Sequence, residues 1–180
     1  MGINAGKISE SSLLGVDFLM IFVTLGTQDK PFNRLLDAIQ REIDNGNIKD
    51  EVIVQQGSTK YDSKDMKFLN LLPINEFDEL VKSCDLLITH GGVGSILTGL
   101  YKGKKIIGAA RLKEYGEVTN NHQLQLLGGF EEKGYILNLA NFDDLGEVLK
   151  KVKKFKPKPF SSNNEVFINK LDDYIKSVIK

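Results

Sequence analysis

The sequence lacks an excess of charge of either sign, and this absence narrows the classes of function open to it. Lysine plus arginine and aspartate plus glutamate each number 24, so the formal net charge is zero. A protein whose affinity for nucleic acid rests on neutralising phosphates carries a clear basic excess. We therefore expect no nucleic-acid partner.

Cysteine and histidine are also scarce, with one cysteine and two histidines in the chain. A single cysteine cannot form an internal disulfide, which is typical of a protein from a reducing cytoplasm. Cys84 lies in VKSCDLLI, where a helix is expected to pass into a strand, so we interpret it as a small buried side chain rather than a nucleophile. These residues form no cluster with ligand spacing, and no metal site is predicted.

Long apolar runs are missing, including from the first nineteen residues, which read MGINAGKISESSLLGVDFL. The short apolar stretches there are far below a membrane-spanning helix or a convincing signal peptide. Met20 then opens a strong strand, MIFVTLG. We interpret residues 1–19 as an extension without function, Met20 as the natural start, and residues 20–180 as one domain with a real core.

From Met20 onward, patterns typical of strands and helices alternate. Strands are expected at Met20–Leu25, Glu51–Gln55, Lys67–Leu72, Asp85–Thr89, Lys105–Ala109 and Tyr135–Leu137. Helices are expected from Pro31 to Ile43 and at Glu76–Ser83, Ser95–Lys102, Thr119–Lys133, Phe142–Lys150 and Asn164–Ile179. Repeated βα units with crossovers of this length predict an α/β fold with a doubly wound parallel sheet.

The stretch Leu86–Ile96, LLITHGGVGSI, is the most informative in the chain. An apolar strand ends at His90, a glycine-rich turn follows, and a helical pattern begins at once. Glycines allow a ligand to approach the backbone, and the first N–H groups of a helix attract an anion such as a phosphate. The alternative is that the glycines only close a tight connection between strand and helix.

Three polar segments fall at the carboxyl ends of the predicted strands, where ligands of such sheets bind. The first is Thr24–Gln28 and the second is His90–Ser95. The third contains Arg111, Glu117 and then Asn120-Asn121-His122-Gln123 at the start of a helix. Asn121, His122 and Gln123 either cap that helix or bind a hydroxyl-rich ligand, because amides and imidazole both donate and accept hydrogen bonds.

The segment KKVKKFKPKP, Lys150–Pro159, is rich in lysine. It is predicted to be a solvated, proline-stiffened connector between the last two helices. The alternative is a contact with an anionic membrane surface or an acidic partner, where each lysine contributes about 1 kcal/mol.

TLGTQ near the start, THGGVGSI in the middle and RLKEYGEVTNNHQ downstream resemble the small donor-binding subunits of two-component glycosyltransferases, from about Met20 to Ile179. The eukaryotic subunit helps to add the second N-acetylglucosamine to a dolichol-diphosphate acceptor, and bacterial relatives build capsule or exopolysaccharide repeats. The resemblance implies a Rossmann-like fold equivalent to the C-terminal half of a GT-B transferase. The domain of this kind is the C-terminal domain of glycosyltransferase family 28.

The resemblance also implies roles for residues of this chain. The diphosphate of a UDP-sugar, either UDP-galactose or UDP-N-acetylglucosamine, would bind at the glycine turn and the first loop. The residues implied there are Gly26, Thr27, Gly91, Gly92, Val93, Gly94 and Ser95. Asn121, His122 and Gln123 would contact the transferred sugar, and Arg111 and Glu117 complete the predicted donor site. His90 and Gln123 are the predicted catalytic residues, His90 as a donor contact more than as a base.

Relatives carry a carboxylate for the ribose hydroxyls on the helix after the glycine turn, and Thr98 stands at that position here. The sequence has no Asp-x-Asp motif, so neither a metal nor a cofactor is expected, and fixed dipoles would stabilise the leaving group.

The resemblance implies an inverting hexosyltransferase that is half of an enzyme. A membrane-anchored partner subunit would supply the polyprenyl-diphosphate-linked acceptor and the base, and would hold this cytoplasmic chain at the inner face of the membrane. The alternatives are a nucleotide-sugar-binding module without chemistry and an autonomous transferase, although two GT-B halves need about twice a typical domain's residues. A dehydrogenase is disfavoured because the glycine turn follows the fourth strand and no Gly-x-Gly-x-x-Gly fingerprint is present.

Overall fold

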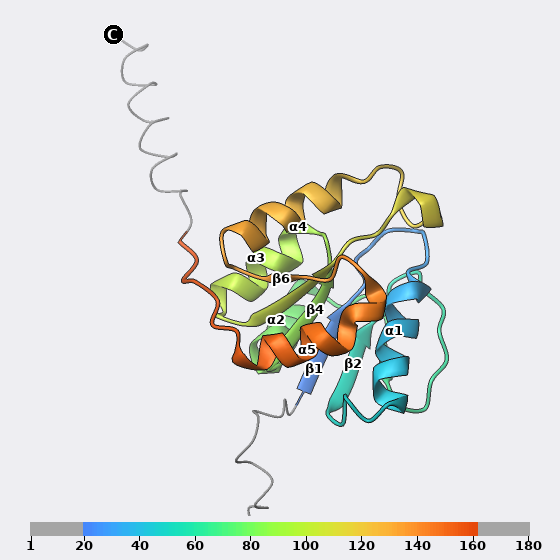
Figure 1. The fold of residues 1–180 in the computed structure, drawn as a ribbon. Coiled ribbons are helices and arrows are strands. Elements are labelled where there is room, and N and C mark those ends of the chain that lie inside the picture. Colours follow the sequence, from blue (N-terminus) through green and yellow to red (C-terminus); the bar gives the residue numbers. More distant parts are fainter. Residues whose placement is uncertain (1–19, 162–180) are drawn as a thin grey trace, which may run out of the picture.

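The computed structural model describes residues 20–161, which form a six-stranded parallel sheet between two layers of helices (Figure 1). The strands are β1 (Met20–Thr24), β2 (Glu51–Gln55), β3 (Lys67–Leu69), β4 (Leu86–His90), β5 (Lys105–Ala109) and β6 (Leu137–Asn138). The α-helices are α1 (Asn33–Asp44), α2 (Ile74–Ser83), α3 (Val93–Tyr101), α4 (His122–Glu132) and α5 (Leu145–Lys154). Two short 3-10 helices are η2 (Lys113–Tyr115) and η3 (Phe142–Asp144). The predicted Rossmann-like α/β fold is thereby confirmed.

The strands follow the order β3-β2-β1-β4-β5-β6, so the direction of winding reverses between β1 and β4. Every neighbouring pair is parallel, and Thr24 lies opposite both Gln55 and Thr89. The carboxyl ends of β1, β2 and β4 therefore meet at one edge, where the reversal opens a crevice for a ligand.

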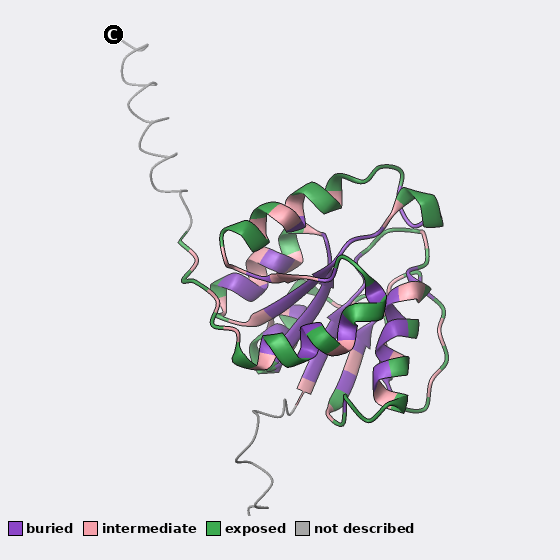
Figure 2. Cartoon of the chain, viewed as in Figure 1, coloured by how far each residue is buried: buried purple, intermediate pink, exposed green. Residues whose placement is uncertain are grey.

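The sheet is buried on both faces because successive side chains of a strand point to opposite sides. Ile21 and Val23 of β1 pack with α1 and α5 in one core, and Phe22 packs with α2 and α3 in the other. Figure 2 shows the strands buried along most of their length and the helices buried along one stripe. Two packed layers of helices thus hold the strand ends rigidly in place.

Several element boundaries differ from the predicted ones. The third strand stops at Leu69 rather than Leu72, and the helix predicted to start at Thr119 starts at His122. Helix α3 begins at Val93, two residues before the predicted start, so the glycine turn is shorter than expected. The last strand is Leu137–Asn138 rather than Tyr135–Leu137. Element ends depend on capping contacts that a periodicity of side chains does not contain.

The lysine-rich segment is part helix and part connector. Helix α5 continues to Lys154, and an extended segment follows, in which the N–H of Lys158 donates to the carbonyl of Gly134. Phe160 then packs edge-on against Tyr101 and Tyr135, with ring centroids 5.2 and 5.3 Å away. The proposed membrane or partner contact of these lysines stays a prediction.

Other predictions concern Cys84 and the chain ends. Cys84 is buried, and burial raises the pKa of its thiol to about 11, which confirms the interpretation of a small packed side chain. Residues 1–19 and the helix predicted at Asn164–Ile179 lie outside the described residues. Within residues 20–161, no helix combines the length and apolarity that a membrane crossing requires.

Candidate functional site

A cavity of about 460 Å³ lies at the reversal of strand order, above the carboxyl ends of β1, β2 and β4. The residues that line it are Thr24, Gly26, Thr27, Gln55, Leu71, Leu72, Ile74, Phe77, His90, Gly92, Gly94, Ser95 and Thr98. The first loop, the glycine turn and the start of α3 thus enclose a single space. Two of the three polar segments that the sequence places at the strand ends meet there.

The ring of His90 is held between two glycines. A Cβ on Gly26 would lie 2.5 Å from Cε1 and Nε2 of His90, and a Cβ on Gly92 would lie 2.3 Å from Nε2. Gly26 also has a φ of +80°, which side-chain-bearing residues rarely adopt. These two glycines therefore accommodate the histidine ring as well as the close turn of the backbone.

The surroundings of His90 keep its imidazole neutral. Burial lowers its pKa to about 4, an effect that the contact with the Thr24 carbonyl opposes and the nearby Arg111 charge reinforces. Nδ1 lies 3.4 Å from the Thr24 carbonyl oxygen, which places the ring proton on Nδ1 and leaves Nε2 as an acceptor. In the free protein Nδ1–H of His90 therefore faces the Thr24 carbonyl, and Nε2, between Gly26 and Gly92, is the ring atom that can accept a proton.

Gly94 differs from the glycines around His90. It lies in the first turn of α3, lines the cavity, and no atom lies within 4 Å of a Cβ built on it. The first N–H groups of a helix have no partner inside the helix, and the helix dipole adds positive potential there. With Ser95 beside it, the start of α3 presents unshielded backbone to the cavity, as an anion site requires.

The cavity has one apolar wall and no ionic wall. Leu71 and Leu72 from the loop after β3 face it with Ile74 and Phe77 of α2, and Ile74 is 77% exposed. None of the residues that line this cavity is an aspartate, glutamate, lysine or arginine. The cavity is thus suited to a flat apolar group at one end and to an anion held by backbone dipoles at the other.

Gln123 lies beside the glycine turn, outside the residues that line the cavity. Its Oε1 accepts a hydrogen bond of 2.9 Å from the backbone N–H of Arg111. A Cβ built on Gly91 would lie 2.6 Å from the Cβ of Gln123. Gly91 is therefore small because Gln123 packs across it. The oxygen of Gln123 is occupied, which leaves its amide NH₂ as the group that it presents.

Asn121 and His122 lie at the exposed start of α4. Asn121 does not cap the helix with its side chain: its Oδ1 accepts from the N–H of Lys113, and its Nδ2 donates to Glu114. The N–H of His122 donates instead to Oδ1 of Asn120. Of the two alternatives for this segment, capping by the Asn121 side chain is thus not observed; that side chain contacts η2 instead, and His122 is exposed.

Arg111 is 1% exposed and lies beneath the first loop rather than in the cavity wall. Its Nη2 donates to the Leu25 carbonyl at 2.7 Å and its Nη1 to the Lys30 carbonyl at 2.8 Å. The guanidinium also lies 4.7 Å from the centre of the Phe32 ring. Burial lowers the pKa of Arg111, and Glu117 acts against this effect. The side chain fastens the loop that carries Gly26 and Thr27.

Glu117 is 5% exposed and is likewise engaged within the protein. Its carboxylate accepts from Nε and Nη2 of Arg34 at 3.1 and 2.7 Å and from the N–H of Leu112 at 2.9 Å. Arg34 also donates to the Ala110 carbonyl and stacks on the rings of Tyr115 and Phe142. Sequence reasoning missed Arg34, because it lies on a helix face that reads as polar surface.

Gln55 and the apolar wall were also missed. Gln55 ends β2, lines the cavity and has a buried amide oxygen without a hydrogen-bond partner among the described residues. A polar side chain at the carboxyl end of a strand is the signal that could have identified it. Leu71 and Ile74 lie outside a recognisable pattern, since they sit in a loop and at a helix start.

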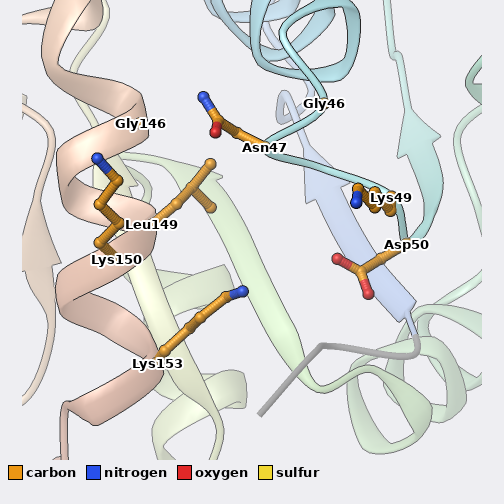
Figure 3. Close-up of a pocket in the computed structure, with 8 residues that line it drawn as sticks. All are labelled: Gly46, Asn47, Lys49, Asp50, Gly146, Leu149, Lys150 and Lys153. Carbon is orange, nitrogen blue, oxygen red and sulfur yellow. The ribbon is translucent and has the colours of Figure 1, made fainter. Parts of the chain in front are cut away.

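A second hollow, of about 280 Å³, lies between α5 and the loop that joins α1 to β2 (Figure 3). Lys150 and Lys153 of α5 line one side of it, opposite Asn47, Lys49 and Asp50 of the loop. Lys150 is paired with Glu147 at 2.8 Å, so the positive charge there is partly neutralised. It lies where β2 begins, away from the strand ends that carry the glycine turn, and we assign no ligand to it.

Among the described residues, no group of three or more histidine, cysteine, aspartate or glutamate side chains is arranged to hold a metal ion. The residues of the main cavity also carry no thiol or carboxylate that would ligate one. Its polar groups are hydroxyls, amides, one imidazole and backbone N–H groups. Such groups bind and orient a ligand by hydrogen bonds.

The comparison with known families gives a match over nearly the whole chain. The profile of the glycosyltransferase family 28 C-terminal domain matches residues 20–178. Among proteins of curated function, none matches this sequence.

Solved structures similar to this fold include ALG13 and two glycosyltransferases of antibiotic synthesis. ALG13 in solution is 22% identical, with a TM-score of 0.54 over 87% of this chain and 96% of its own. The glycosyltransferase of kitacinnamycin (17% identity, TM-score 0.57) shares 85% of this chain and 39% of its own. The match to the calicheamicin glycosyltransferase CalG4 (14% identity, TM-score 0.54) covers 77% of this chain and 34% of CalG4. This chain therefore spans less than half the length of the two antibiotic enzymes, and identities this low show the fold alone.

Proposed function

Because this chain belongs to the family of the glycosyltransferase family 28 C-terminal domain, we propose that its cavity binds the nucleoside diphosphate of a sugar-nucleotide donor. The observation that carries this proposal is the cavity at the reversal of strand order, where the uncovered start of α3 faces an apolar wall. An anion at one end and a planar base at the other would each meet the surface that their chemistry requires.

The diphosphate is assigned to the backbone N–H groups around Gly94 and Ser95. These groups and the dipole of α3 are fixed before the ligand arrives, so they stabilise negative charge without reorganising. No lysine or arginine lines the cavity to neutralise that charge. We propose that fixed dipoles and His90 stabilise the leaving diphosphate, and that the transfer does not depend on a metal ion.

His90 is assigned to the diphosphate as a proton-accepting contact. Its Nε2 lies between Gly26 and Gly92, at the edge of the same cavity. A phosphate oxygen beside Nε2 favours the protonated ring, because a negative charge stabilises the imidazolium. Donor binding would then draw a proton onto His90, and the N–H so formed would hold the leaving group.

The nucleobase of the donor is assigned to the apolar wall of Leu71, Ile74 and Phe77. The transferred sugar is assigned to the other end of the diphosphate. Gln123 presents its NH₂ beside the glycine turn, and Asn121 and His122 lie exposed at the start of α4. These polar groups suit the hydroxyls of a hexose such as galactose or N-acetylglucosamine. Arg111 and Glu117 act on the donor site indirectly, by fastening the loops beside it.

The acceptor is assigned to a second subunit. A transferase of this kind needs a base for the acceptor hydroxyl, and no carboxylate lines the cavity among the described residues. We propose that a membrane-associated partner binds a polyprenyl-diphosphate-linked sugar, supplies the base and completes an inverting hexosyltransferase for polysaccharide synthesis. The same observation favours a second candidate, a nucleotide-sugar-binding module without chemistry.

Calorimetric titration of the chain with UDP, UDP-galactose, UDP-N-acetylglucosamine and NAD, with and without EDTA, tests the donor site. We expect the uridine ligands to bind regardless of EDTA, and NAD not to bind. Gly94→Leu fills the cavity where a side chain meets no protein atom, so it should abolish binding without unfolding the chain. Gly129→Leu, on a helix with equal space, is the matched control. Binding that survives Gly94→Leu would refute the assigned position.

Catalysis is tested separately from binding. The chain is mixed with its membrane partner, a polyprenyl-diphosphate-linked sugar and each donor, and transferred sugar is counted. Transfer that needs both subunits supports the bipartite enzyme. Donor binding without transfer by any combination favours the module without chemistry, and transfer by this chain alone contradicts the need for a partner.

A further inference from the structure

Among the described residues that line the donor cavity, none is an aspartate or a glutamate, and this bears on how the cavity recognises the ribose of the nucleotide. Resting on the proposed function, we infer that the cavity accepts 2′-deoxynucleoside diphosphates about as well as ribonucleoside diphosphates. We further infer that Thr98 is the position that sets this tolerance. The substrate class is thereby widened from uridine donors to deoxynucleoside donors, including thymidine diphosphate sugars.

The pentose lies between the two ends of the cavity. The diphosphate is assigned to the start of α3, at Gly94 and Ser95, and the base to the apolar wall formed with Phe77. Thr98 lies one helical turn beyond Ser95, on the same face of α3, because residues three apart in a helix are neighbours. It also lines the cavity, so the ribose hydroxyls come to lie beside it.

A ribose is best distinguished by a carboxylate, which accepts hydrogen bonds from the 2′- and 3′-hydroxyls together. A threonine hydroxyl has one proton and a single oxygen, so it serves one of the two hydroxyls. Helix α2, which carries Phe77, has three carboxylates, Glu76, Asp78 and Glu79, and none of them lines the cavity. Asp78 is paired with Lys102 at 3.2 Å. Among the described residues that line the cavity, none offers a charged acceptor to the diol.

The absence of a 2′-hydroxyl is tolerated for a second reason. A site rejects an analogue strongly when the missing group leaves a buried polar partner unpaired. Thr98 is only half-buried, and its hydroxyl can turn to water when the 2′-hydroxyl is missing. Gln55, the fully buried amide of the cavity, lies at the end of β2 on the opposite side from α3.

The test compares UDP with dUDP, which differ only in the 2′-hydroxyl, by calorimetric titration. For the unchanged chain we expect dissociation constants within about threefold of each other, since one exchangeable hydrogen bond is at stake. In Thr98→Glu, the new carboxylate should favour UDP over dUDP by about tenfold or more. Repulsion between this carboxylate and the diphosphate affects both ligands equally, so it cancels in the ratio.

Thr98→Gln is the matched control, because it has the length of glutamate without the charge. It should leave the UDP to dUDP ratio close to that of the unchanged chain. A dUDP affinity about 30-fold or more below that of UDP in the unchanged chain would overturn the inference. An equal ratio in Thr98→Glu and Thr98→Gln would overturn the assignment of Thr98. Failure of both nucleotides to bind the unchanged chain would refute the donor site itself, and this inference with it.

Discussion

The packing of His90 between glycines makes a prediction that can be worked out from distances. In Gly92→Ala, the new Cβ would lie 2.3 Å from Nε2 of His90, more than an ångström inside ordinary contact. The backbone at Gly92 has a φ of −82°, which alanine adopts without strain. The cost is therefore overpacking alone, and we expect a loss of about 1–3 kcal/mol in the free energy of unfolding.

A double-mutant cycle isolates this contact. His90→Ala removes the ring, so the added methyl group of Gly92→Ala should cost nothing in that background. The coupling free energy between the two positions should then be about 1–3 kcal/mol. Urea unfolding followed by circular dichroism supplies the four free energies of unfolding.

Gly94→Ala is the control for this cycle, since no atom lies within 4 Å of its added Cβ. It should stabilise the chain by up to about 1 kcal/mol, as alanine favours a helix over glycine. A Gly92→Ala protein as stable as the unchanged chain, or additivity within about 0.5 kcal/mol in the cycle, would refute the packing of His90 against Gly92.

Three further predictions concern buried groups. Burial lowers the pKa of His90 to about 4 in the free protein, and a bound diphosphate should raise it. Binding then takes up protons, so UDP-galactose should bind more tightly as the pH falls from 7 to 5. His90→Gln should show no such pH dependence. Arg111→Met should destabilise the chain by about 2–4 kcal/mol in urea unfolding, because it leaves the carbonyls of Leu25 and Lys30 buried without their donor, while Glu117 keeps its ion pair with Arg34. A loss below about 1 kcal/mol would contradict the role of the guanidinium. Cys84, whose pKa burial raises to about 11, should resist a thiol reagent at pH 8 until urea unfolds the chain, and rapid labelling of the folded protein would contradict its burial.

The alternation of apolar runs was enough to predict the sheet and five of its helices, because burial on both faces imposes a strong pattern on each strand. The same pattern predicted that the segment after β4 would face a ligand crevice, since the carboxyl ends of parallel strands share one edge. Boundaries were less accurate, as at β3 and α4, where loop contacts and not periodicity set the ends. Residues 162–180, which include the whole of the predicted last helix, lie outside the described structure.

The sequence did not predict why each position of the turn is a glycine. Gly91, Gly92 and Gly94 read alike in the motif, yet one accommodates Gln123, one accommodates His90 and one meets no side chain. The difference arises because the partners come from distant strands and helices that only folding brings together. Gly92 and Gly94 both line the cavity, but only an added Cβ on Gly94 would meet no side chain there.

The sequence by itself determined the order of strands and helices, the position of the glycine turn before α3 and the neutrality of the chain, because these depend on local patterns and composition. The tertiary structure decided which polar residues meet the cavity and which support it. Arg111 and Glu117 lie in a polar segment at the strand ends, yet contacts 86 and 83 residues away along the chain draw them inside. Leu71 and Ile74 form part of the cavity wall because the fold brings them next to residues from distant parts of the chain. Their positions in the sequence do not indicate this contact.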